Sequence, residues 1–484
     1  MDGPDRDPSP GAPPLSFGLN FQLSTMMFLQ YAIWGAWLPI LYPYLMGHRS
    51  FSLDQCGMIL AAGAAGAILG PFVAGQVADR HFHTEKFLAA SHLLGAVLVW
   101  FLATIDSFNA FLVLSLLYGV IYAPTLALTN SLAFHHLPDR DRDFGKVRVW
   151  GTIGWIAVGL GVGHWLGARY TPEGIGELTT WAGNVGLESM AAQLAGAGPE
   201  ETKSITQEIV TAAQNAGRAD AFRLSSILGV AMAGFCLVLP KTPPSKEARQ
   251  SNATMEALGE VRKQPLLTLF LLAIPISMVH QFYFVHTSSF LTLLQNRADD
   301  AAEFAQSINR ILGVGGGGLM TIGQMAEILV LASMPILAKK FTRKTLLGVG
   351  ILAYAGRMAI FANFDGMVPI LFGVALHGLC FGCFIFVAFM VVDEETTSDV
   401  RASAQNLFNL VVVGIGIIVG SWFATSVVGS YATVPNPALP GETMTDFTRL
   451  FSIPMWMSLA CFLALLVFYR GGTRATGELE GAAA

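Results

Sequence analysis

The most unusual side chain in this 484-residue sequence is that of Glu327, which stands in the apolar stretch GQMAEILVLASMPIL at residues 323–337. Thr321, Gln324 and Glu327 recur every three residues, so in a helix their side chains share one face. Two interpretations are open. Glu327 could be a buried carboxylate that ties helices together through hydrogen bonds, or it could face a cavity, bind hydroxyl groups and carry a proton. The choice depends on what surrounds the helix.

A second group of side chains also has helical spacing. Arg148, Thr152 and Trp155 occupy positions i, i+4 and i+7 in the stretch VRVWGTIGW, so they share a helical face. The guanidinium of Arg148 could donate hydrogen bonds to the oxygens of a bound solute. It also lies close to a predicted helix end, where a long side chain can reach lipid phosphates. The residues alone leave both roles of Arg148 open.

Two further apolar stretches carry polar candidates. MVHQFYFVHTSSF, at residues 278–290, contains Gln281, whose amide can both donate and accept hydrogen bonds. LHGLCFGCFIF, at residues 376–386, contains His377 and Phe381. His377 could contact a solute, titrate near neutral pH or pack as a hydrogen-bonded core histidine. Phe381 could stack on a flat solute, although aromatic side chains in membrane helices commonly serve packing.

The composition shows which solvent surrounds these helices. Hydrophobic residues make up 53% of the chain, charged residues make up 13%, and the mean hydropathy is +0.55. Ordinary soluble domains carry roughly 25% charged residues. The chain is therefore a membrane protein, in which an intramembrane acid is functional by default, and this favours the cavity-facing interpretation of Glu327. No P-loop or H-E-x-x-H motif occurs, so we expect neither an ATP-driven pump, nor a metal site, nor an enzyme.

Apolar runs near the ~20 residues needed to span a bilayer predict an all-α protein with twelve transmembrane helices. These runs lie at residues 22–45, 54–77, 86–105, 110–134, 147–168, 224–240, 266–294, 315–338, 344–362, 368–392, 402–428 and 451–469. We expect a disordered tail at 1–21, six helices at 22–240 with an insertion at 169–223, a linker at 241–264, six helices at 265–470 and a tail at 471–484.

The distribution of lysine and arginine predicts the orientation of the chain in the membrane. Short connections on the cytoplasmic side carry more of these residues than connections outside. The basic clusters Arg140–Lys146, Lys241–Lys263 and Lys339–Lys344 all lie between an even-numbered and the following odd-numbered helix. Both tails and the 241–264 linker are therefore expected in the cytoplasm, the insertion is expected outside, and the protein is expected in the plasma (inner) membrane of the cell.

The two predicted halves repeat one another. Helices two and eight both end in basic connections, GQVADRHFHTEK and PILAKKFTRK. Helices five and eleven are both preceded by acidic residues and an arginine, Arg148 or Arg401. Parallel six-helix halves with a solute site between them are a transporter arrangement.

The motif Gly75-x-x-Ala78-Asp79-Arg80 resembles the loop signature of the major facilitator superfamily. Gly75, Asp79, Arg80 and Arg401 are therefore expected to act in the conformational change. Longer stretches resemble the nucleoside:proton symporter family, from the first helix to the last: LQYAIWGAWLP, YAPTLALTNSLAF, VRVWGTIGW, GQMAEILV and VRASAQNLFN. This resemblance implies a major facilitator fold of two six-helix bundles and a nucleoside site between them.

The resemblance also implies roles for individual residues. The matching positions that would bind the nucleoside are Arg148, Thr152, Trp155, Gln281, Gln324, Glu327, His377 and Phe381. The sequence departs from the family pattern at three positions. Phe284 stands where the family has an Asn, His377 where it has a Tyr, and Gly382 where it has an Asp. Because one intramembrane acid is missing, Glu327 is the principal candidate for proton coupling.

Together these observations predict a secondary transporter that imports nucleosides with protons by alternating access. We expect a monomer in the lipid bilayer that needs no cofactor beyond the proton gradient and binds no nucleic acid. One alternative is a major facilitator transporter or uniporter for another small hydroxylated solute. Another is a membrane sensor or scaffold that transports nothing, although a scaffold has no need for polar faces inside the membrane.

Overall fold

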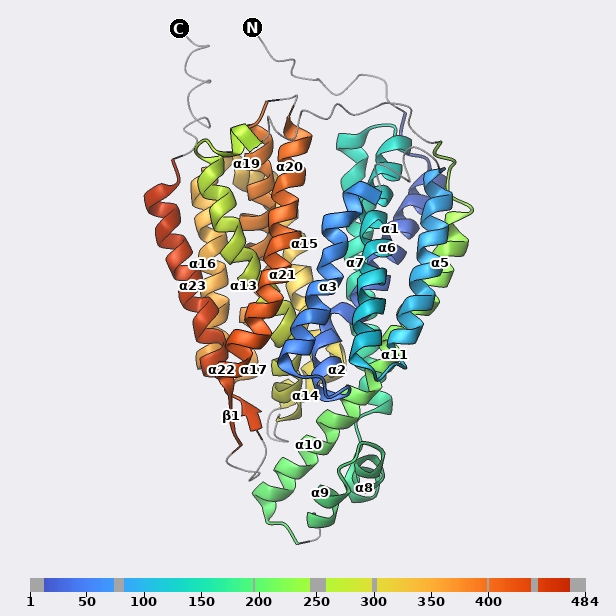
Figure 1. Ribbon diagram of the computed structural model, residues 1–484, viewed down its shortest axis with the longest axis vertical. Helices are drawn as coiled ribbons and strands as arrows, with labels where there is room; N and C mark the ends of the chain where they lie inside the picture. The colour runs from blue at the N-terminus through green and yellow to red at the C-terminus, as the bar shows by residue number, and fades with distance from the viewer. Residues whose placement is uncertain are drawn as a thin grey trace.

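The computed structural model describes residues 13–73, 82–194, 196–243, 258–297, 303–397, 400–436 and 443–470. Nearly all of these residues lie in helices, which form two bundles side by side (Figure 1). Helices α8 and α9 project from one end of the molecule, and α19 and α20 lie at the opposite end (Figure 1). We call these the α8–α9 end and the α19–α20 end.

The N-terminal bundle is built from the first half of the chain. Its elements are α1 (Phe17–Trp37), η1 (Leu38–Ile40), α2 (Leu41–Gly47), α3 (Leu53–Val73), α5 (Thr84–Leu102), α6 (Phe108–His136), α7 (Arg140–Arg169) and α11 (Ala219–Cys236). Helix α1 packs on α7 and α11, while α3 and α5 pack on α6. The 3-10 turn η1 follows from Pro39, which cannot donate the hydrogen bond that would continue α1.

The C-terminal bundle repeats this arrangement. Its elements are α13 (Leu266–Asn296), α14 (Glu303–Leu312), α15 (Gly317–Lys340), α16 (Arg343–Asn363), α17 (Met367–Ala375), α18 (His377–Leu379), η3 (Cys380–Phe386), α19 (Val387–Glu394), α20 (Arg401–Asn409), η4 (Leu410–Ile415), α21 (Gly416–Trp422), η5 (Phe423–Gly429), α22 (Ser430–Ala432) and α23 (Phe447–Phe468). The segments η3, η4 and η5 are π-helical. Strands β1 (Thr433–Pro435) and β2 (Thr443–Thr445) form a small antiparallel hairpin before α23.

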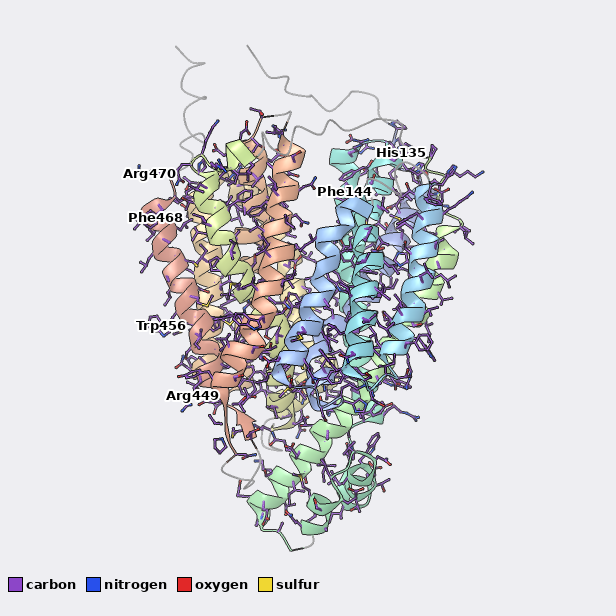
Figure 2. The ribbon with its side chains drawn as sticks, viewed as in Figure 1. His135, Phe144, Arg449, Trp456, Phe468 and Arg470 are labelled. Carbon is purple, nitrogen blue, oxygen red and sulfur yellow. The ribbon has the colours of Figure 1, made fainter. Side chains whose placement is uncertain are left out.

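Within the described ranges, ten helical segments are long and apolar enough to cross a membrane. Helices α1 and α3, each of 21 residues, bring the number of long segments among the described residues to twelve. Helix α23 shows how such a segment suits a bilayer. Trp456 on its outer side is 65% exposed, and Figure 2 shows this side chain between Arg449 and Arg470, at the two ends of the helix. Its 22 residues span about 33 Å, close to the ~30 Å hydrocarbon core.

Several boundaries differ from the sequence-based expectation. Helix α1 begins at Phe17 rather than at residue 22, because the hydroxyl of Ser16 caps it by accepting from the backbone N–H of Leu19. The expected 1–21 tail is therefore too long. The sixth transmembrane helix, α11, begins at Ala219 rather than at residue 224. The tenth is interrupted by the π-helical segment η3.

The expected insertion contains three helices, α8 (Gly174–Asn184), α9 (Glu188–Gln193) and α10 (Pro199–Gly217). They have a small core of their own, formed by Leu178, Ala182, Leu194, Ile205, Ile209 and Val210. Helix α10 is 19 residues long and leads through Arg218 into α11. Helix α10 also contacts α13 of the other bundle, so the insertion touches both halves.

Candidate functional site

A cavity of about 550 Å³ lies between the two bundles. Both halves contribute to its wall, the N-terminal half through α1, α3, α6 and α7 and the C-terminal half through α13, α15, η3 and the α20–α21 region. All eight residues expected to bind a solute line it: Arg148, Thr152, Trp155, Gln281, Gln324, Glu327, His377 and Phe381. The tertiary structure thus brings together side chains from four transmembrane helices, the fifth, seventh, eighth and tenth. That they bind substrate remains a prediction.

The N-terminal wall of the cavity is aromatic around Arg148. The guanidinium carbon of Arg148 lies 4.1 Å from the ring centroid of Tyr31, a cation–π contact that holds the charge toward the cavity. Trp34 meets Trp155 edge to face, with 5.8 Å between the ring centroids. Tyr31 and Trp34 also line the cavity and were not among the expected site residues, although both lie in the stretch LQYAIWGAWLP that carries the family resemblance.

Three amides line the C-terminal wall: Gln281, Gln324 and Asn409. The Nε2 of Gln281 donates to Ser421 Oγ over 3.0 Å, which orients its carbonyl oxygen. Gln324 is 6% exposed, and its Oε1 has no hydrogen-bond partner among the described residues. An unpaired buried acceptor is costly, so Oε1 of Gln324 is suited to an N–H or O–H group of a bound solute.

Glu327 faces the cavity and has a histidine behind it. Its side chain is 16% exposed, and its Oε2 lies 3.8 Å from Nε2 of His377. The other ring nitrogen of His377, Nδ1, lies 3.1 Å from Nη1 of Arg357 on α16. Of the three open interpretations of His377, this geometry favours a hydrogen-bonded histidine, although its ring also lines the cavity.

Two glycines allow this contact. A Cβ atom on Gly378 would lie 2.5 Å from the backbone of Ala326, and one on Gly323 would lie 2.9 Å from Cβ of His377. Only glycine permits helices to approach so closely. The absence of side chains at Gly323 and Gly378 therefore sets the distance between Glu327 and His377.

The structure also explains the glycine at position 382, where the family resemblance implies an acid. Gly382 is not in the cavity wall, and a Cβ atom on it would lie 2.5 Å from Cγ1 of Val330. Val330 and Met334 of α15 fill the space in front of it. Phe284, which stands where an amide was expected, does line the cavity. The cavity wall therefore lacks the expected amide at position 284, whereas position 382 is covered by Val330 and Met334.

Hydrogen bonds between the two bundles cluster at the α8–α9 end. Arg218 is fully buried and donates across the interface to Thr292 Oγ1 and to the carbonyl of Gly315, each over 2.9 Å. Nδ2 of Asn296 donates to Thr211 Oγ1 over 2.9 Å, and the backbone N–H of Val314 donates to the carbonyl of Gly163 over 3.1 Å. These bonds hold the α8–α9 end of the cavity closed.

The residues expected to act in the conformational change lie away from the cavity or outside the described residues. Gly75, Asp79 and Arg80 fall in the 74–81 gap of the description. Arg401, at the start of α20, pairs with Asp393 of α19 at 3.6 Å, and Gln405 also donates to Asp393. This contact lies within the C-terminal bundle, and the expected role of Arg401 remains a prediction.

The arrangement of two helical bundles around a central cavity is that of a major facilitator-type transporter. A crystal structure of the nucleoside transporter NupG has the same fold, with a TM-score of 0.72 over 94% of this chain and 100% of that chain, at 21% sequence identity. A bacterial homologue of the human lysosomal transporter Spinster, in an inward-facing and unoccupied conformation, matches with a TM-score of 0.62 at 16% identity, covering 93% of this chain and 95% of that chain.

The sequence assigns the chain to one family among these transporters. The pattern of the nucleoside H⁺ symporter family matches residues 17–177 and 205–474, and the chain belongs to this family of transporters, which are not enzymes. Escherichia coli YegT is 30% identical over 407 residues, 82% of each chain. Xanthosine permease of Escherichia coli is 25% identical over 464 residues, 93% of this chain and 95% of that one. The family match omits residues 178–204, which hold most of α8, all of α9 and the start of α10.

Proposed function

We propose that this protein imports nucleosides across the cell's plasma (inner) membrane and is driven by protons that move inward with them. The observation that carries this proposal is the convergence of an arginine, four amides, a carboxylate and several aromatic rings from both bundles on one cavity. The hydrogen-bonding and stacking chemistry of these groups suits a nucleoside. Amides can pair with the edges of a base, a carboxylate can accept from ribose hydroxyls, and aromatic rings can stack on the base.

In this proposal the two walls of the cavity have different roles. Arg148, Thr152 and Trp155 contact the solute from the N-terminal bundle. Gln281, Gln324, Glu327, His377 and Phe381 contact it from the C-terminal bundle. Glu327 also carries the coupled proton, because it is both in the cavity wall and beside a buried hydrogen-bond donor. No cofactor is needed, and the working unit is a monomer in the bilayer.

The bonds that close the α8–α9 end suggest which state the structure represents. With both chain termini in the cytoplasm, as the lysine and arginine distribution predicts, the α8–α9 end faces outside. The structure would then be an inward-facing state, closed to the outside by Arg218, Thr292 and Gly315. Import would require these bonds to break in the outward-facing state, as the two halves rock around the cavity.

The decisive experiment is uptake of radiolabelled nucleosides into proteoliposomes that contain the purified protein, with and without an inward proton gradient. We expect accumulation above the external concentration only when the gradient is present. Protein-free liposomes are the control for leakage. Failure to accumulate or exchange any nucleoside would overturn the proposed cargo, and accumulation that ignores the proton gradient would overturn the proposed coupling.

One observation supports a second candidate. Phe284 stands in the cavity wall where the family resemblance implies an amide, so the cavity can make fewer hydrogen bonds to a bound solute. The protein could then carry another small hydroxylated solute, or act as a uniporter. Competition between labelled nucleosides and a panel of sugars and polyols in the same vesicles distinguishes these cargoes.

A further inference from the structure

Arg357 carries a buried positive charge, and the proposed transport function assigns no role to it. It lies in α16, within a membrane-spanning segment, and its side chain is fully buried. A charge in this position is costly and calls for a compensating partner. Among the described residues no ion pair includes Arg357, and its Nε and Nη2 have no hydrogen-bond partner.

The contacts of Arg357 lead toward Glu327. Its Nη1 lies 3.1 Å from Nδ1 of His377, and its guanidinium carbon lies 4.2 Å from the ring centroid of Tyr283. The ring of His377 in turn stacks on Tyr283, with 4.9 Å between the centroids. The aromatic stack holds both the guanidinium and the imidazole in place. Arg357 therefore has one directional hydrogen-bond partner among the described residues, and that partner is the histidine beside Glu327.

The hydrogen bond from Arg357 determines how His377 is protonated. A guanidinium can only donate, so Nδ1 of His377 must accept and carries no proton. The proton of the neutral ring is then on Nε2, which points toward Oε2 of Glu327 at 3.8 Å. A doubly protonated ring would place an N–H of His377 against an N–H of Arg357 and add a second positive charge. His377 is therefore held as a neutral donor directed at Glu327.

We propose that Arg357 is a positioning residue for proton coupling, which acts through His377 to stabilise Glu327 in its deprotonated form. This inference rests on the proposed function of Glu327 as the proton carrier. When Glu327 gives its proton to water in the cavity, the carboxylate accepts the Nε2–H of His377 as the 3.8 Å separation closes. The charge of Arg357, on the far side of the ring, then compensates the new negative charge.

Other titratable groups face this site and remain in place in Arg357→Met and His377→Phe, the two variants that test the proposal below. They come from every helix packed against it: Arg148 on α7, His280 and Tyr283 on α13, Tyr354 on α16 and Cys380 on η3. Nδ1 of His280 shares a 2.7 Å hydrogen bond with the hydroxyl of Tyr354, so His280 is engaged away from Glu327. Arg148 approaches Glu327 from the cavity side. Arg357 differs from it because its effect passes through His377.

The test compares Arg357→Met with Tyr354→Phe on the same helix. Arg357→Met removes the charge and keeps an unbranched side chain, whereas Tyr354→Phe removes one hydroxyl and leaves the arginine–histidine contact. The pH dependence of nucleoside exchange is measured in proteoliposomes without a gradient. Protonation of Glu327 is followed separately by infrared difference spectroscopy of the purified protein, with Glu327→Gln to assign the carboxyl band.

In Arg357→Met we expect two midpoints to move to higher pH by about one unit or more: that of the exchange–pH profile and that of the infrared titration of Glu327. The reason is that loss of a nearby positive charge favours the protonated carboxyl. Tyr354→Phe is expected to leave them unchanged. If the midpoints of Arg357→Met equal those of the wild type, the proposal is wrong. A merely structural role for Arg357 would lower protein yield or exchange rate without moving the midpoint.

His377→Phe provides a second, independent test and replaces Arg357→Met should the latter not fold. It keeps a ring against Tyr283 but removes both nitrogens, so it should give the same upward shift. The double variant should shift no further than either single one, whereas additive shifts would contradict a path through His377. If the wild type exchanges no nucleoside, the proposed function fails, and the infrared titration still decides the role of Arg357.

Discussion

The guanidinium of Arg218, at the junction of α10 and α11, donates over 2.9 Å to the carbonyl oxygen of Gly315 in the turn that precedes α15. This bond joins the N-terminal bundle to the C-terminal bundle at the α8–α9 end of the molecule. The same guanidinium donates to Thr292 Oγ1 on α13. One buried side chain therefore fastens both the seventh and the eighth transmembrane helices to the opposite half.

Replacing Arg218 should loosen this closure. Hydrogen bonds to charged groups are worth about 1.5–3 kcal/mol each. Arg218→Met should therefore raise the ratio of the outward-facing state to the state closed at the α8–α9 end by at least tenfold. The measurement is the distance distribution between spin labels at Ile175→Cys and Ile311→Cys, two exposed positions on opposite halves. Arg223→Met, which breaks an ion pair within the N-terminal half, is the control. An unchanged distribution in Arg218→Met would show that the bond does not hold the halves together.

Neutralising Glu327 should uncouple transport from protons. Glu327→Gln keeps an acceptor and a donor in the cavity but cannot gain or lose a proton. We expect it to exchange nucleosides across the membrane and to lose accumulation driven by a pH gradient. Glu395→Gln, which alters an exposed carboxylate at the end of α19, should behave as the wild type. Full gradient-driven accumulation by Glu327→Gln would remove Glu327 from the coupling mechanism.

Placing an acid at position 382 should destabilise the protein. In Gly382→Asp the new side chain overlaps Cγ1 of Val330, and overpacking of this kind costs about 1–3 kcal/mol, in addition to the cost of burying a carboxyl group. The expected result is a lower melting temperature of the detergent-solubilised protein. Adding Val330→Ala makes room and should restore part of the loss. If Gly382→Asp is as stable as the wild type, Val330 does not occupy the space of the missing acid.

The close approach of α18 to α15 should depend on Gly378. An alanine there meets the backbone of Ala326, which cannot move aside as a flexible side chain could. Gly378→Ala should therefore separate His377 from Glu327, lower the melting temperature and weaken nucleoside exchange. Gly356→Ala is the matched control, because its added methyl group meets a side chain at an ordinary distance of 3.6 Å. In that variant the better helix propensity of alanine should leave stability unchanged or slightly higher. Equal effects of the two substitutions would contradict this account.

Much of this protein could be predicted from its sequence. Long apolar runs located the transmembrane helices, because a helix in lipid must satisfy its backbone internally and cover itself with apolar side chains. Three-residue and four-residue spacings placed Gln324 beside Glu327 and Arg148 beside Thr152, since both pairs lie on a single helix. The family followed from short stretches such as VRVWGTIGW. The signal that singles out Glu327, a charge within an apolar run, is also present at Arg357 in the ninth helix.

Contacts between helices were decided by the tertiary structure. Arg357, His377 and Glu327 come from three different segments, and no spacing along the chain shows that one imidazole lies between a guanidinium and a carboxylate. The glycine at position 382 could be read from the sequence as a missing acid, but only the packing of Val330 shows that the space is already filled. Periodicity specifies which face of a helix is polar. Which face of which other helix it meets depends on close packing across the bundle, where a single glycine sets the distance.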